Sequence, residues 1–145
     1  MRYRQLGRTG LQVSRLALGT VSLGAAYGIP VPGEFGRPAE ADAIRILEYA
    51  VDSGINLFDT APAYGDSEQL IGKALKNRPD CCIATKIAIP LDAAGRPLGG
   101  NALRHNVVES LEASLCALQR DCLDIVQVHN ATIEVIHRGE LAATP

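Results

Sequence analysis

Residues 55–65 read INLFDTAPAYG: a short apolar run stops at Asp59, and a loop then leads to Tyr64. A buried strand that ends on a carboxylate and a loop is typical of parallel α/β proteins. In such proteins the loops at the carboxyl ends of the strands carry the functional groups. This stretch therefore predicts a functional site at one end of a parallel sheet.

Two further apolar runs also end on an ionisable residue, residues 82–85 at Lys86 and residues 125–128 at His129. The carboxyl ends of parallel strands meet at one rim of a sheet or barrel. We therefore expect these two side chains to lie close to Asp59, with the tyrosine of the loop beside them.

The remainder of the chain alternates between strand and helix patterns. We expect an opening hairpin at residues 2–6 and 11–13, and strands at residues 16–18, 55–59, 81–86 and 123–128. Helical spacing of apolar residues predicts helices at residues 40–53 and 67–76, and from residue 101 to 119 or 120. Residues 21–38 read as a long Gly- and Pro-rich loop, and residues 134–143 show only a weak helical pattern. This alternation predicts a single α/β domain over residues 1–145, with right-handed βαβ units and a parallel sheet.

Local sequence predicts some details of these elements. Asp66, with Gln69 three residues later, fits a capping box at the start of the second helix. Asn101 fits the N-cap of the third helix. Residues 123–128 are apolar at nearly every position, which predicts a strand buried on both faces.

The composition is that of an ordinary globular domain of 145 residues, with 47% hydrophobic and 21% charged residues. A net charge of −2 and few aromatic side chains exclude a general nucleic-acid or anionic-membrane binder. No apolar run is long enough to span a bilayer, so we expect no membrane partner. The four cysteines lack the spacing of metal ligands, which indicates no metal site and a reducing, cytoplasmic setting.

The residues at the strand ends are suited to delivering a proton to a carbonyl oxygen. The phenol of Tyr64 is a weak acid at neutral pH unless a neighbouring cation favours the phenolate, and Lys86 supplies a cation. A lysine at the end of an apolar strand needs a partner, and Asp59 supplies the opposite charge. His129 can donate a hydrogen bond to a substrate oxygen or shuttle a proton. Because no side chain donates hydride, reduction of the carbonyl would require a cofactor.

Each of these residues also has an ordinary structural interpretation. Asp59 can be a turn or cap residue, and Tyr64 a half-buried packing residue. Lys86 can be a solvated strand end, and His129 a structural histidine. Since three of the four residues end successive strands, their convergence favours a shared site. Thr20, after the first strand, is a further candidate for lining the same pocket.

Several motifs along the chain carry a family resemblance. They are RQLGRTGLxVS at residues 4–14, LGT at 18–20, GINxFDTAxxYG at 54–65, SExxIG at 67–72, ATK at 84–86, SLxxSL at 110–115 and LDIVQVH at 123–129. Together they resemble the aldo-keto reductases, over about the whole chain. The resemblance implies a (β/α) barrel of TIM type, plugged at its base by the hairpin, of which this chain holds about the first half.

The resemblance also implies NADPH-dependent reduction of aldehydes or ketones to alcohols, with a small carbonyl compound as the substrate. By motif position Tyr64 would be the general acid, Lys86 and Asp59 would tune its acidity, and His129 would orient the carbonyl group. Thr20 and Asp59 would lie near the nicotinamide end of the cofactor. In the family, most contacts to the cofactor phosphates and adenine come from the second half of the barrel.

A half-barrel has two apolar outer strands, here residues 16–19 and 123–128, as free edges. We therefore expect the chain to pack against another copy of itself or against another polypeptide. Two alternatives to a reductase stay open at this point. One is a non-catalytic half-barrel that serves as an assembly module or remnant, and the other is a Schiff-base aldolase that uses Lys86.

Overall fold

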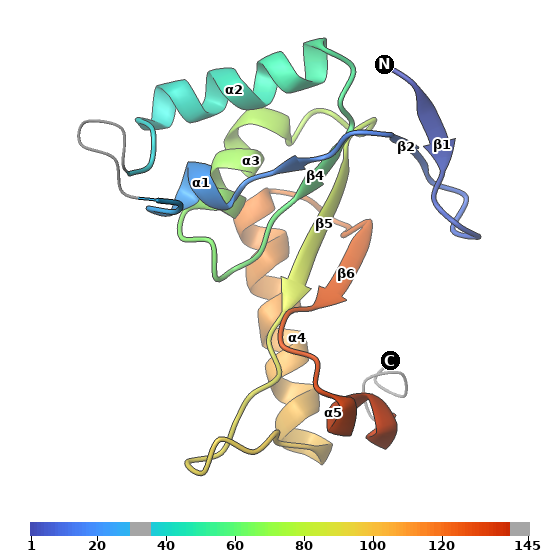
Figure 1. Ribbon diagram of the computed structural model, residues 1–145, viewed down its shortest axis with the longest axis vertical. Helices are drawn as coiled ribbons and strands as arrows, with labels where there is room; N and C mark the ends of the chain where they lie inside the picture. The colour runs from blue at the N-terminus through green and yellow to red at the C-terminus, as the bar shows by residue number, and fades with distance from the viewer. Residues whose placement is uncertain (30–35, 140–145) are drawn as a thin grey trace.

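A four-stranded parallel sheet forms the centre of the structure, a computed structural model that describes residues 1–29 and 36–139. Its strands are β3 (Leu18–Gly19), β4 (Leu57–Asp59), β5 (Cys82–Ile87) and β6 (Ile125–Val128), side by side in that order. Figure 1 shows them running in one direction, so that their carboxyl ends share one rim. The parallel α/β fold that the sequence predicts is therefore confirmed.

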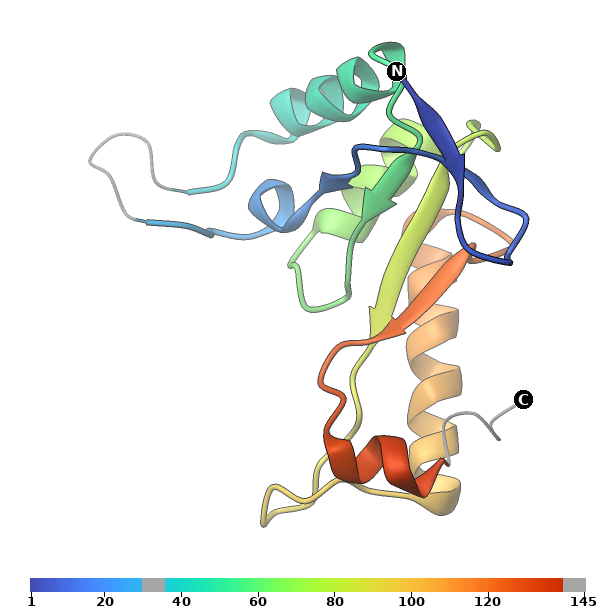
Figure 2. The same cartoon turned by 45° about the vertical axis from the view of Figure 1, so that its right-hand side comes forward.

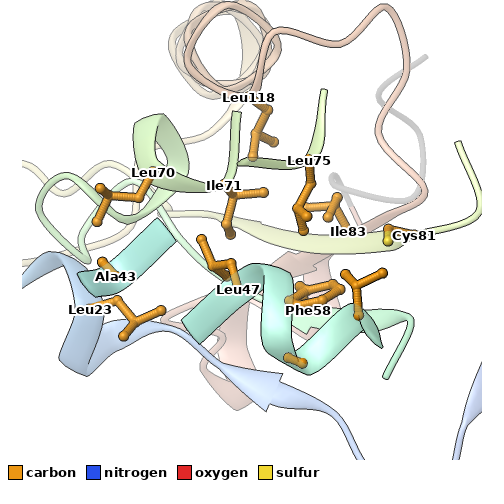
Figure 3. Packing of buried hydrophobic residues seen from close by; sticks show 12 residues of the cluster. Leu23, Ala43, Leu47, Phe58, Leu70, Ile71, Leu75, Cys81, Ile83 and Leu118 are labelled. Carbon is orange, nitrogen blue, oxygen red and sulfur yellow. The ribbon is translucent and has the colours of Figure 1, made fainter. Parts of the chain in front are cut away.

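The longer helices connect these strands and lie on one face of the sheet (Figure 2). They are α2 (Glu40–Asp52), α3 (Ser67–Leu75) and α4 (Gly100–Leu118), each close to its predicted position. Leu47, Ile71 and Leu118, one from each helix, are at most 1% exposed. They belong to one cluster with Phe58 of β4 and Ile83 of β5 (Figure 3). Burial of such side chains stabilises the fold by about 1.5–3 kcal/mol each.

A second buried cluster lies beyond the carboxyl end of β5. Its members are Ile87, Ile89, Leu103, Val107 and Val135. They come from β5 and the loop after it, from the first half of α4 and from α5 (Ile133–Arg138). This cluster extends the hydrophobic packing to the rim where the carboxyl ends of the strands lie.

The helices α3 and α4 cross very closely at Gly72. A Cβ atom at this position would lie 2.4 Å from the backbone oxygen of Ala117, so only glycine fits without a shift of the backbone. This close contact holds α3, which follows the loop after β4, firmly against α4.

The opening hairpin lies at the amino ends of the sheet strands (Figure 1). It consists of β1 (Tyr3–Gln5) and β2 (Gln12–Ser14), paired antiparallel as predicted. The backbone N–H of Ser14 donates to Asn56 Oδ1 at 2.7 Å, and Asn56 Nδ2 donates to the oxygen of Gln12 at 2.9 Å. Because Asn56 directly precedes β4, these bonds fix the hairpin to the base of the sheet.

Two predicted helix caps are wrong. Asp66 occupies the N-cap position of α3, but its side chain makes no cap hydrogen bond and forms an ion pair with Arg37 instead. The helix α4 begins at Gly100 with Gly99 as its N-cap, so Asn101 lies inside the first turn rather than before it. In the first case an ion pair with a residue distant in sequence replaces the local capping bond.

The predicted burial of the last strand on both faces is also wrong. Ile125 and Val128 of β6 are half-buried, and Val126 is 44% exposed. Within the described residues β6 pairs with β5 alone, so it forms an edge of the sheet. An apolar sequence is buried on both faces only where further strands or helices cover it.

Part of the predicted long loop is helical, since residues 21–24 form the short helix α1 (Val21–Gly24). Residues 30–35 of that predicted loop lie outside the described residues. The weak helical pattern near the end corresponds to α5, whose first turn is capped by the side chain of Thr132. The rest of that pattern, residues 140–143, also lies outside the described residues.

Candidate active site

Lys86 and Asp59 form an ion pair across neighbouring strands. Asp59 of β4 is in register with Ala84 of β5, and Lys86 lies two residues further along on the same face. The Lys86 Nζ atom is 2.6 Å from Asp59 Oδ1 and donates a second hydrogen bond to the oxygen of Thr60 at 3.0 Å. The Lys86 side chain is only 13% exposed, so its charge requires the partner that the sequence predicts.

Tyr64 lies over the same ammonium group. The Lys86 Nζ atom is 4.8 Å from the centroid of the Tyr64 ring, within the range of a cation–π contact. The backbone N–H of Tyr64 donates to the oxygen of Ala61 at 2.9 Å, which shapes the turn that brings the ring to this position. The aromatic ring of Tyr64 and the ammonium group are therefore direct neighbours.

His129 completes the group from the end of β6. Its ring meets the ring of Tyr64 edge to face, with centroids 5.6 Å apart. Its backbone N–H donates to the oxygen of Ile87 at 2.8 Å, which continues the pairing of β5 with β6. The structure thus brings together all four residues that the sequence singles out at and near the strand ends.

Asn130, next to His129, makes a structural contact at this rim that sequence reasoning missed. Its Oδ1 atom accepts from the backbone N–H of Ile89 at 2.7 Å, and its Nδ2 atom donates to the oxygen of Ile89 at 3.1 Å. These two hydrogen bonds join the segments that follow β5 and β6. The amide next to the histidine is the only sequence signal for this role.

The strand β5 is also fixed from its other face, at the residue before Lys86. The hydroxyl of Thr85 donates to Glu68 Oε1 on α3 at 2.5 Å. Thr85 is fully buried and Glu68 is 5% exposed. A buried carboxylate needs such a hydrogen-bond donor. The bond also fixes β5 at Thr85, the residue directly before Lys86.

Thr20 lies immediately behind the site. Its side chain is fully buried, and its hydroxyl donates to the backbone oxygen of Asp59 at 2.8 Å. It therefore contacts the end of β4, next to the predicted nicotinamide position. Its role as a cofactor contact stays a prediction.

A small cavity opens at this rim. Its volume is about 170 Å³, and it is lined by Pro62, Ala63, Lys86, Ala88, Pro90, Asn106, Ser110 and His129. It combines apolar walls with the lysine and the histidine of the cluster, which is the character of a small-molecule site. Its volume is far below that of a whole dinucleotide.

The thiols near the sheet are not candidates for nucleophilic chemistry. Burial raises the pKa of the Cys82 thiol to about 11, and it also raises the pKa of the Cys81 thiol. These thiols are therefore protonated at neutral pH, and the thiolate is the nucleophilic form.

Within residues 1–29 and 36–139, no cluster of three or more His, Cys, Asp or Glu side chains is placed to hold a metal ion. No helix in this part of the chain has the length and hydropathy needed to cross a membrane.

Comparison with known proteins defines the class of this fold and site. The model of the aldo/keto reductase family matches residues 15–135. This match covers most of the sequence, and the chain belongs to the aldo/keto reductase family. The predicted resemblance is therefore confirmed.

The relatives show how much of a family member this chain contains. The aldo-keto reductase YhdN of Bacillus subtilis is 40% identical over 134 residues, which cover 89% of this chain and 38% of that protein. L-galactose dehydrogenase of Arabidopsis thaliana is 38% identical over 133 residues, which cover 88% of this chain and 37% of that protein. The chain spans about two fifths of the length of these relatives.

A solved structure gives the same result for the fold. The holo form of the aldo-keto reductase AKR11C1 from Bacillus halodurans matches with a TM-score of 0.75 at 33% identity. The match covers 99% of this chain and 45% of that one. The parallel sheet of this chain is therefore a partial barrel of TIM type.

Proposed function

We propose that this chain carries the proton-delivery site of an NADPH-dependent reductase of small aldehydes or ketones. The observation that supports the proposal is the contact of one ammonium group, that of Lys86, with both Asp59 and the ring of Tyr64. His129, which follows β6 at the same rim, lies against the same ring. Lys86 and His129 line a small cavity, and the Tyr64 ring contacts both of their side chains. A phenol, a cation and an imidazole grouped in this way can bind and protonate a carbonyl oxygen.

The proposed step is a balanced two-part addition to the carbonyl bond. The nicotinamide cofactor, when bound, supplies the hydride that reaches the carbonyl carbon. Tyr64 gives its hydroxyl proton to the carbonyl oxygen, so that an alcohol forms and a phenolate remains. The adjacent Lys86 ammonium stabilises the phenolate charge, and Asp59 keeps the ammonium in place. His129 donates a hydrogen bond that orients the carbonyl oxygen.

The described residues fit such a cofactor at its reacting end alone. Lys86, Tyr64 and His129 provide the groups that a carbonyl compound needs next to a hydride donor. Among the described residues, however, neither a Gly-x-Gly-x-x-Gly motif nor a Gly-x-x-x-x-Gly-Lys motif precedes a helix, so neither of these cradles for the cofactor phosphates is present. We therefore assign proton delivery to this chain and do not assign the phosphate contacts to it.

A second candidate function, that of an assembly module, is favoured by the exposed edges of the sheet. Within the described residues β3 pairs with β4 alone, and β6 pairs with β5 alone. Val126 on β6 is 44% exposed, and Leu16, just before β3, is 62% exposed. We propose that these edges associate with strands of another copy or of another polypeptide.

We also propose a reducing, cytoplasmic setting, because all four cysteines are free.

Turnover of carbonyl compounds tests the reductase proposal. We expect NADPH oxidation with a small aldehyde to fall by about 10²- to 10⁴-fold in Tyr64→Phe, because the general acid is lost. Lys86→Met is expected to lose activity as well. The matched controls are Tyr49→Phe and Lys73→Met on the helix surfaces, where the side chains are exposed. Equal turnover by Tyr64→Phe and the unaltered chain would rule the proposal out.

A further inference from the structure

Three fully buried hydroxyl groups lie directly behind the proposed site. They belong to Thr20 after β3, Thr60 after β4 and Ser67 at the start of α3. The Ser67 Oγ atom is 2.5 Å from Thr20 Oγ1 and 3.0 Å from Thr60 Oγ1. Segments from three different elements therefore meet at a single serine.

Hydrogen bonds connect these hydroxyl groups to the backbone of two strand ends. The Thr20 hydroxyl donates to the backbone oxygen of Asp59 at 2.8 Å. The Ser67 hydroxyl donates to the backbone oxygen of Thr20 at 3.2 Å and also contacts the hydroxyl groups of Thr20 and Thr60. The three hydroxyls therefore form one chain of hydrogen bonds that reaches the carbonyl group of Asp59.

This chain of hydroxyl groups is connected to the lysine of the site at two points. The Lys86 ammonium group donates to the Asp59 carboxylate and to the backbone oxygen of Thr60. The backbone oxygen of Asp59 and the side chain of Thr60 are held from behind by the hydroxyl chain. A shift of the Asp59–Thr60 peptide would therefore move both acceptors of Lys86 together.

The same bonds close the loop that carries Tyr64. Thr60 and Ser67 are the two ends of that loop, and their hydroxyl contact joins them. The backbone N–H of Ser67 also donates to the oxygen of Tyr64 at 3.2 Å. Next to it, a Cβ atom on Gly24 would lie 2.4 Å from the Ser67 nitrogen, so the loop also packs tightly against α1.

We propose that Ser67, together with Thr20 and Thr60, is a positioning device that sets the geometry of the Lys86–Asp59 pair and of the Tyr64 ring. The inference rests on the proposed function for its catalytic meaning. The positioning itself concerns this chain's own residues and can be measured without a cofactor. None of the three hydroxyls donates a proton to the substrate; they act through Asp59, Lys86 and Tyr64.

The test is a spectroscopic measurement on matched variants. The Lys86 ammonium lies over the Tyr64 ring, so we expect the ring current to shift the NMR signals of the Lys86 ε-methylene protons. Lys86→Met assigns these signals, and Tyr64→Leu, which removes the aromatic ring, gives their unshifted positions. Thr60→Val keeps the shape of the side chain and removes the hydroxyl group. We expect it to move these signals toward those of an ordinary lysine. Thr60→Ser keeps the hydroxyl group and is expected to leave the signals in place.

Kinetics provide a second, separate readout. If the chain reduces carbonyl compounds, we expect Thr60→Val to lower kcat by roughly 10- to 10²-fold with little change in KM, because the groups are misplaced rather than removed. Thr60→Ser is expected to restore kcat. If the unaltered chain shows no turnover, the proposed function fails, while the lysine signals still decide whether the hydroxyl chain positions the site.

Folding defects are distinguished by a second variant. Should Thr60→Val not fold, Ser67→Ala is measured in the same way, because it removes the central hydroxyl of the chain. The proposal is overturned if a folded Thr60→Val or Ser67→Ala protein keeps the lysine signals and the kcat of the unaltered chain. It is supported if the signals move in these variants and not in Thr60→Ser.

Discussion

The Lys86 ammonium is bound between a carboxylate and a backbone oxygen on the neighbouring strand. With a side chain only 13% exposed, it has little water to replace a lost partner. Asp59 is 36% exposed, so the pair is partly screened. At the scale of single residues, the Lys86–Asp59 pair therefore contributes to the stability of the fold and also holds the ammonium group that the proposed reaction uses.

We expect Asp59→Asn to lower the free energy of unfolding by about 1 kcal/mol, because the lysine keeps its burial and loses its counter-charge. Glu40→Gln is the matched control. It breaks the pair with Lys73, in which both side chains are 46% to 59% exposed, and is expected to change stability by less than about 0.5 kcal/mol. Urea denaturation measures both variants, and equal effects would show that Lys86 does not depend on Asp59.

The residues of the site differ in how far sequence could predict them. Asp59, Lys86 and His129 stand at the ends of apolar runs, so topology alone predicts that they meet. Thr60 and Ser67 were not singled out, because hydroxyl groups give no periodic signal and their contact requires the folded loop. Asn130 also gives no sequence pattern for its role, because its partner Ile89 is distant in sequence and the two meet only in the folded chain.

At the scale of helices and strands, periodicity predicted the order of elements correctly. The apolar stripes of α2 and α3 pack into the core as expected. In α4, Val107 and Leu118 are buried as expected, but Val108 of the predicted stripe is 40% exposed. The predictions are wrong where a residue distant in sequence determines the contact. Asp66, for example, pairs with Arg37 instead of capping α3. The apolar sequence of β6 predicted burial, but burial requires a neighbour, and β6 is an edge among the described residues.

This edge leads to a prediction about association. We expect the unaltered chain to show a mass that rises with concentration in size-exclusion chromatography with light scattering. Val126→Lys places a charge on the exposed edge strand and is expected to shift the chain toward the monomer. Ile133→Lys, on α5 at a side chain that is 73% exposed, is the control and should behave like the unaltered chain. A monomer at every concentration would exclude association through β6.

At the scale of the whole molecule, the chain is a partial barrel of the aldo/keto reductase family with the proposed proton-delivery group at its rim. It spans about two fifths of its curated relatives, so the activity of a whole reductase is a proposal for this chain. The residues proposed as proton donor, cation and hydrogen-bond donor lie together at this rim. What the site requires from elsewhere is the hydride source.

Binding of NADPH, measured by titration calorimetry, tests the reductase proposal most directly. Because the chain alone provides only the reacting end of the cofactor site, we expect its associated form to rebuild that site and to bind NADPH saturably with a dissociation constant in the micromolar range. Tyr64→Phe is expected to bind with the same affinity, because the phenol acts in proton transfer rather than in binding. Such a result would make carbonyl substrates worth screening. The absence of binding at about 1 mM NADPH, where even an affinity near −4.1 kcal/mol is detected, would refute the reductase proposal and leave the assembly module.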